Sequence, residues 1–159
     1  MIRRRSPSLA RDDRGAAVIE FGLLAPILAL FVMGIIDVSR GLSERFTLEQ
    51  AVNRSLELVQ SRNADPAVQE AGDTPEDAYQ FAIDEAEAAA GPGATVTPTL
   101  WRECDGVETT PFNENCDDNS DGTPRDTARY LKIHITKNFQ GEYFLGATTM
   151  VASGSVRIP

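Results

Sequence analysis

The sequence is poor in the residue types from which most catalytic centres are built. It has one histidine, His134, and two cysteines among 159 residues, and it contains no G-x-S-x-G, H-E-x-x-H or phosphate-loop motif. Acidic residues outnumber basic residues by 24 to 15, and the formal net charge is −9. This balance argues against nucleic-acid binding, because that function needs basic patches. We therefore expect a protein that is not an enzyme and has no nucleic-acid partner.

Charged residues are nearly absent from one long stretch near the N-terminus. Between Ala16 and Ile36 the only residue that can ionise is Glu20. A helix over this stretch would be about 31 Å long at about 1.5 Å per residue, close to the hydrocarbon thickness of a bilayer. A carboxylate in such a segment is expensive, which makes Glu20 a functional candidate by default. No A-x-A cleavage pattern follows the run, so we expect a retained membrane anchor rather than a signal peptide.

The charge distribution predicts the orientation of this anchor. Residues 1–15 contain five arginines and two aspartates, a net charge of +3, so the remainder of the chain carries −12. Basic segments beside a membrane span stay in the cytoplasm, whereas acidic segments translocate easily. We expect a cytoplasmic leader over residues 1–15, a transmembrane helix over 16–37, and the remainder in the periplasm of a cell with an inner membrane.

The helix is expected to continue beyond the membrane, over residues 38–62 and as far as about Ser61. Apolar residues recur there largely in steps of three and four, which predicts an amphipathic stripe that packs against a small domain. The stripe consists of Val38, Leu42, Phe46, Val52, Leu56 and Val59. A second helix is expected from Thr74, a suitable N-cap followed by Pro75, to the Gly91-Pro92-Gly93 sequence.

Residues 63–159 are expected to form an α+β domain. Three strands are predicted, over residues 94–101, 130–139 and 148–158, and Pro98 places part of the first at a sheet edge. Leu131, Ile133 and Ile135 alternate with polar residues, so one face of an antiparallel sheet needs a partner. The apolar stripe of the long helix is the expected partner.

The two cysteines, Cys104 and Cys116, both follow the membrane span. In a periplasmic compartment such a pair is typical of a disulfide. Closing this short loop would contribute about 3 kcal/mol in the chain-entropy model.

An acidic loop follows the second cysteine, and it allows two interpretations. Asp117, Asn119 and Asp121, with Gly122 behind them, match the first half of a calcium-binding loop. The twelfth position is Ala128 instead of the expected glutamate, which favours a solvated acidic turn. We expect no cofactor, and calcium is the one candidate ligand.

Gly15, the Glu20-Phe21 pair, Pro26 and the Gly34-x-x-Asp37 stretch follow one another within residues 14–59. In these residues and their order the segment resembles the N-terminal part of the TadE-like proteins, minor pseudopilins of the tight-adherence (Tad, Flp-type) pilus system. A basic leader, a glycine and a glutamate five positions later are similar to the processing site of type IV pilins.

The resemblance implies that a prepilin peptidase cleaves between Gly15 and Ala16 on the cytoplasmic side. Glu20 would then pair with the new α-amino group of Ala16 on its own or a neighbouring subunit, and pairing makes a buried charge tolerable. The resemblance also implies a pilin-like fold, a role in pilus assembly, and three partners: the bilayer, the peptidase, and other pilins and pseudopilins.

A different class of protein also fits the sequence. It is an unprocessed, membrane-tethered periplasmic binding module, for which calcium is a candidate ligand. The mass of the N-terminus in the purified membrane protein distinguishes the two interpretations.

Overall fold

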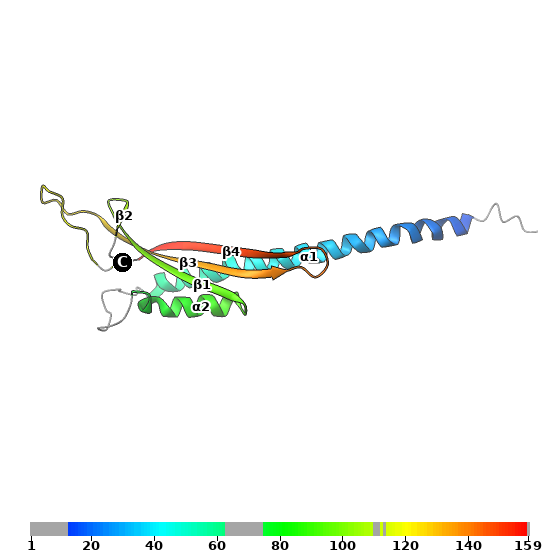
Figure 1. Cartoon of the computed structure of the whole chain (residues 1–159), viewed down its shortest axis with the longest axis horizontal. Coiled ribbons are helices and arrows are strands. Elements are labelled where there is room, and N and C mark those ends of the chain that lie inside the picture. The colour runs from blue at the N-terminus through cyan, green and yellow to red at the C-terminus, as the bar shows by residue number, and fades with distance from the viewer. Residues whose placement is uncertain (1–12, 63–74, 110–111, 113, 159) are drawn as a thin grey trace, which may run out of the picture.

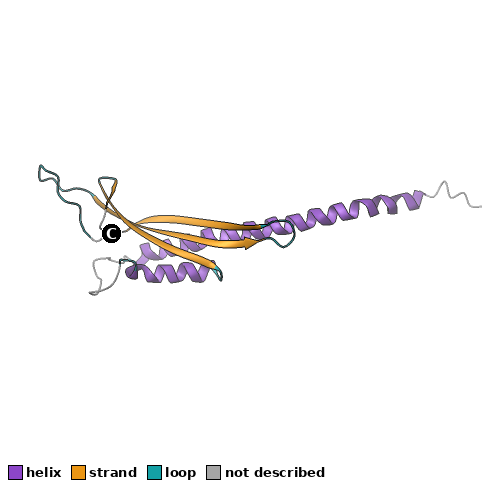
Figure 2. Ribbon diagram, in the orientation of Figure 1, coloured by secondary structure: helices purple, strands orange, loops and turns teal. Residues whose placement is uncertain are grey.

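The computed structural model describes residues 13–62, 75–109, 112 and 114–158 (Figure 1). Its elements, in chain order, are α1 (Asp13–Arg62), a short 3₁₀ helix η2 (Asp77–Tyr79), α2 (Gln80–Ala90), β1 (Ala94–Cys104), β2 (Val107–Thr109), β3 (Thr127–Gln140) and β4 (Ala147–Ile158). The N-terminal half of α1 projects from the molecule, and its second half lies along the sheet (Figures 1 and 2). The predicted α+β class is therefore confirmed.

Helix α1 is one continuous element of 50 residues with Pro26 inside it. It ends at Arg62, close to the predicted Ser61, but it begins at Asp13 rather than at Ala16. The expected boundary between leader and span therefore falls within the first turn of the helix.

The sheet is antiparallel, with the strand order β2-β1-β3-β4. The three predicted strands are confirmed, and β2 is an additional short strand that pairs with Arg102–Cys104 of β1. Asp105 and Gly106 have positive φ values of 52° and 81° in the turn between β1 and β2. An Asp-Gly pair is the strongest short-range hairpin signal, so the sequence did contain evidence for β2.

Pro98 lies at a sheet edge, as predicted. Its Cα is opposite Ile133 of β3, while β2 reaches only as far as Arg102 on the other side of β1. A residue without an N–H group is tolerated there because its outer side has no strand to bond.

The core lies between one face of the sheet and the two helices. Leu131, Ile133 and Ile135 of β3 are fully buried, as their alternation predicted. They pack in one cluster with residues of α1, η2 and α2, among them Leu48, Val52, Val59, Tyr79, Ala82 and Ala86. Helix α1 covers the β4 side of this face and α2 covers the β1 side (Figure 1).

The predicted apolar stripe of α1 is correct only in its second half. Val52 and Val59 are buried, and Leu56 packs against the core. Val38, Leu42 and Phe46, by contrast, are 50–55% exposed. Here the helix packs through Asp37, Gly41 and Leu48, which are buried, and the first two of these have no large apolar side chain.

Gly41 explains why apolar periodicity identified the wrong face. A Cβ at this position would lie 3.6 Å from both Met150 and Phe139, so β3 and β4 approach the helix over a residue that has no side chain. Small and polar residues make this contact, and a search for apolar residues cannot detect them. The stripe of Val38, Leu42 and Phe46 is left exposed and continues the apolar surface of the span.

The second helix starts later than predicted. Its regular α-helical part begins at Gln80, after the 3₁₀ turn, and it ends at Ala90 before Gly91, whose φ is 74°. The predicted N-cap, Thr74, lies outside the described residues. The predicted end is confirmed.

Candidate membrane-anchoring and assembly site

The projecting half of α1 presents apolar side chains in all directions. From Val18 to Ile36 the large apolar residues are 37–72% exposed. Within the described part of the chain, α1 is the one helix long and apolar enough to cross a membrane, and it lies near the N-terminus. These features fit a single-pass membrane protein.

Glu20 and Phe21 lie on this projecting helix, and both are exposed. Among the described residues the Glu20 carboxylate has no hydrogen-bond or ion-pair partner. Gly15 lies in the first turn of α1 and is exposed, with no atom near the position of a Cβ. The backbone of Ala16 is helical too, and its side chain lies outside the described residues. The processing and pairing roles of these four residues stay predictions.

A carboxylate to which the sequence assigned no role lies where the apolar run ends. Asp37 is completely buried, whereas Ile36, the residue before it, is exposed. Its Oδ1 accepts a hydrogen bond from the backbone N–H of Glu142 at 2.9 Å. Its Oδ2 accepts three more, from Tyr143 at 3.0 Å, Phe144 at 2.6 Å and Leu145 at 3.1 Å.

The segment that donates these bonds is the turn between β3 and β4, residues 141–146, which we call the β3–β4 loop. In Figure 1 this loop lies beside α1, at the end of the sheet nearest the projecting helix. A Cβ on Gly141 would lie 2.5 Å from Cβ of Leu145, so the fold of the loop requires glycine there. The sequence marker for the site was the position of Asp37, a carboxylate immediately after an apolar run.

Ion pairs join α1 to the same end of the sheet. Arg40, one turn beyond Asp37, pairs with Glu142 of the loop. Glu44 pairs with Lys137 of β3, and the Lys137 ammonium also donates to the backbone carbonyl of Ala90 at the end of α2, at 3.0 Å. Together with the Asp37 bonds, these contacts tie the helix to the sheet close to the end of the apolar run.

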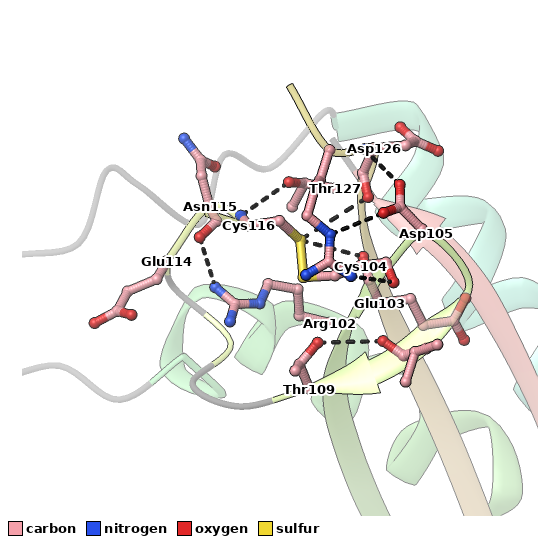
Figure 3. The surroundings of a disulfide bond; sticks show 12 residues. Arg102, Glu103, Cys104, Asp105, Thr109, Glu114, Asn115, Cys116, Asp126 and Thr127 are labelled. Atoms are coloured by element: carbon pink, nitrogen blue, oxygen red, sulfur yellow. Dashed lines mark hydrogen bonds and ion pairs between the residues drawn. A yellow bond between two sulfur atoms is a disulfide. The ribbon is translucent and has the colours of Figure 1, made fainter. Parts of the chain in front are cut away.

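The predicted disulfide between Cys104 and Cys116 is present and joins the end of β1 to the acidic loop (Figure 3). Beside it, the Asp105 carboxylate accepts hydrogen bonds from Arg125 Nε at 2.8 Å and from the Asp126 N–H at 3.1 Å. The Arg125 guanidinium and the Asp126 N–H hold the pKa of Asp105 below its usual value. This end of the domain, far from α1's projecting half, is closed by covalent and ionic contacts.

The acidic loop is closed by its own hydrogen bonds. Asp121 Oδ1 accepts from the backbone N–H of Thr123 at 3.0 Å and from its hydroxyl at 2.6 Å, which lowers the pKa of Asp121. The Asn119 side-chain amide donates to the same hydroxyl at 2.9 Å. Asp117 is exposed. Among the described residues, no group of three or more His, Cys, Asp or Glu side chains is arranged to hold a metal ion. The expectation of a solvated turn and the calcium alternative both stay predictions.

Trp101 and His134 lie in neighbouring strands of the sheet, β1 and β3. The indole of Trp101 stacks on Tyr130 with ring centroids 5.1 Å apart, and its Nε1 donates to Glu103 at 3.0 Å. Trp101 is thus a packing residue of the sheet. His134 is partly exposed in β3, between the buried Ile133 and Ile135.

The N-terminal part of the chain matches a known family. Residues 15–55 match the family model described as TadE-like protein. The matched segment contains Gly15, the Glu20-Phe21 pair and Asp37, so it covers both the span and its first contact with the sheet domain. Comparison with curated proteins and with solved structures gives no match. The resemblance found in the sequence is confirmed over this segment, and it suggests involvement in the Tad pilus system.

Proposed function

We propose that this protein is a minor pseudopilin that takes part in the assembly of a Tad-type pilus and has no enzymatic activity. The observation that carries the proposal is the TadE-like match over residues 15–55, which coincides with a projecting apolar helix that begins around Gly15. The span crosses the inner membrane once, with the N-terminus in the cytoplasm and the sheet domain in the periplasm. The positive leader and the acidic remainder support this orientation.

Prepilin peptidase would cleave the bond between Gly15 and Ala16. Because α1 begins at Asp13, this bond lies in the first helical turn. The peptidase must therefore unwind that turn, since a protease binds its substrate with an extended backbone. The first turn is the easiest to open because its N–H groups have no partners within the helix. Glycine at position 15 also favours unwinding, because it destabilises a helix by about 1 kcal/mol relative to alanine.

After cleavage, Glu20 would pair with the new α-amino group of Ala16 in its own or a neighbouring subunit. Its exposed position and its lack of a partner among the described residues support this role, because a carboxylate in lipid needs one. The neighbouring helix would also pack over Gly34, where an apolar groove is lined by Phe31, Ile35, Val38 and Ser39.

The decisive experiment is N-terminal mass analysis of the protein purified from membranes of cells with and without prepilin peptidase. We expect the chain to begin at Ala16 in the first case and to retain residues 1–15 in the second. An intact leader in cells with active peptidase would overturn the processing step. It would favour the alternative, an unprocessed tethered binding module.

A further inference from the structure

The β3–β4 loop exposes three consecutive large side chains that the pilus role does not use. Tyr143 is 47% exposed, Phe144 57% and Leu145 41%. Exposed apolar residues that occur singly are ordinary, but a contiguous group on a loop tip marks an interaction surface.

Hydrogen bonds to α1 hold the backbone of this loop in place. Four consecutive N–H groups, from Glu142 to Leu145, all donate to the carboxylate of Asp37. Because hydrogen bonds to a charged acceptor are stronger than neutral ones, the loop is held firmly against α1. The structure therefore positions Tyr143, Phe144 and Leu145 outside the core.

The height of the loop along α1 is set by the same bonds. Asp37 is the first residue after the apolar run, and one residue is about 1.5 Å of helix. The polar interfacial layer on each side of a bilayer is about 5–7 Å thick. A loop bonded to Asp37 therefore lies in the interfacial layer if residues 16–36 fill the hydrocarbon core.

The chemistry of the loop fits that layer. Aromatic residues gather at membrane interfaces because their rings are apolar while a tyrosine hydroxyl still reaches water. The charged neighbours, Glu142 and Arg40, pair with each other one turn further from the hydrocarbon. The loop is bonded to Asp37, the residue at which the exposed apolar part of the span ends, so its three exposed side chains lie at the level of that end.

We propose that the β3–β4 loop is a second membrane anchor, in which Tyr143, Phe144 and Leu145 insert into the outer interfacial layer of the bilayer and hold the sheet domain against the membrane. The occupant of this surface is lipid rather than another protein, because the hydrogen bonds to Asp37 hold the loop at the end of the apolar run, at the level of the interfacial layer. The proposal depends on α1 crossing a membrane, but not on a role in pilus assembly.

The test places single tryptophans in the full-length protein with Trp101→Phe as the background, a change that keeps an aromatic ring against Tyr130. Phe144→Trp reports on the loop and Ile27→Trp on the span. Val107→Trp is the matched control, because Val107 is also apolar and exposed, at 63%, but lies in β2. Each variant is reconstituted in phosphatidylcholine–phosphatidylglycerol vesicles that carry a nitroxide lipid label either near the headgroup or near the bilayer centre.

We expect the shallow nitroxide to quench Phe144→Trp and shift its emission to the blue relative to Val107→Trp. The deep nitroxide should quench Ile27→Trp, and neither label should quench Val107→Trp. If Ile27→Trp is quenched while Phe144→Trp is no more quenched than Val107→Trp, the loop is not a membrane anchor, although α1 still crosses the bilayer. If Ile27→Trp is also unquenched, the span itself is wrong. A blue shift of Phe144→Trp that disappears on dilution with lipid would assign the surface to a second protein copy and overturn the proposal.

A second variant tests how the loop is held. Asp37→Asn replaces one acceptor oxygen by a donor and removes the charge, so at least one N–H of the loop loses its bond. Added to the Phe144→Trp protein, it should reduce shallow quenching several-fold and leave Ile27→Trp quenching unchanged. Equal quenching with and without Asp37→Asn would show that the carboxylate does not set the depth of the loop.

Discussion

The packing of α1 on the sheet depends on Gly154 in β4, and its replacement gives the sharpest stability test. The Cα of Gly154 is opposite that of Ile133 in β3, and Val52 and Leu56 of α1 lie over it. A Cβ at this position would lie 2.9 Å from Val52 Cγ1 and 2.9 Å from Leu56 Cδ1. Val52 is 2% exposed and has little room to move. Gly154→Ala therefore overpacks the contact between helix and strand.

The expected loss is a difference of two terms. Overpacking a core position costs about 1–3 kcal/mol. Replacing glycine by alanine recovers about 0.4–1 kcal/mol by restricting the unfolded chain. The midpoints of the two ranges, about 2 and about 0.7 kcal/mol, leave a net destabilisation of about 1.3 kcal/mol, which lowers Tm by about 5–10 °C. Gly154→Val should be worse, because it adds two more methyl groups to the same contact.

Thermal unfolding of the full-length protein in detergent, followed by circular dichroism, measures this loss. Ser155→Ala is the matched control, since Ser155 is the next residue and is exposed, and its Tm should stay near that of the original protein. In a double-mutant cycle, Gly154→Ala should lower Tm less in a Leu56→Ala background than in the original protein, because Leu56→Ala removes one of the two blocking groups. A Gly154→Ala protein as stable as the original, with no coupling to Leu56→Ala, would refute the close packing of α1 on β4.

Three further predictions concern charge and metal. Glu20→Gln should leave membrane insertion unchanged but prevent pilus assembly, because the amide cannot pair with an ammonium; normal pili on cells that carry this variant would exclude the pairing role. Asp105 has a lowered pKa in the folded state, so its contacts with Arg125 and Asp126 stabilise the fold above the usual aspartate pKa and are lost as the pH falls through the lowered value. The loss of Tm between pH 7 and strongly acidic pH should accordingly be smaller in Asp105→Asn than in the original protein, with Asp118→Asn as the control, and equal losses would contradict this. We expect the acidic loop to bind no calcium, so Tm should be the same with calcium and with chelator. A rise of Tm with calcium that Asp121→Asn abolishes would contradict this and establish a calcium site.

Much of the fold followed from local sequence patterns. The apolar run from residue 16 to 36, with Glu20 as its one ionisable residue, predicted the projecting helix, because only a lipid environment makes such a long apolar surface stable. The alternation of Leu131, Ile133 and Ile135 predicted the buried face of β3, since a strand turns successive side chains to opposite faces. The two cysteines, together with their expected location in the periplasm, predicted the disulfide. Strand β2 was missed because it has only three residues, although the Asp105-Gly106 pair marked its turn.

Some residues of the candidate site were predicted from the sequence, and one was not. Gly15, Ala16, Glu20 and Phe21 were found because their roles are written in a short continuous motif. Asp37 was not assigned a role, because its partners come from a loop more than a hundred residues later in the chain. No periodicity in α1 indicates that a buried carboxylate will receive the N–H groups of residues 142–145.

The sequence by itself determined that the protein has an apolar N-terminal helix, a TadE-like segment and a small α+β domain with a disulfide. These features depend on composition, on short-range periodicity and on a contiguous motif. Only the tertiary structure decided which face of α1 meets the sheet, and it is the face of Asp37, Gly41 and Leu48 instead of Val38, Leu42 and Phe46. The reason is physical: close packing over a glycine and hydrogen bonds to a buried carboxylate depend on atoms brought together from distant segments, and apolar spacing along one helix does not record them.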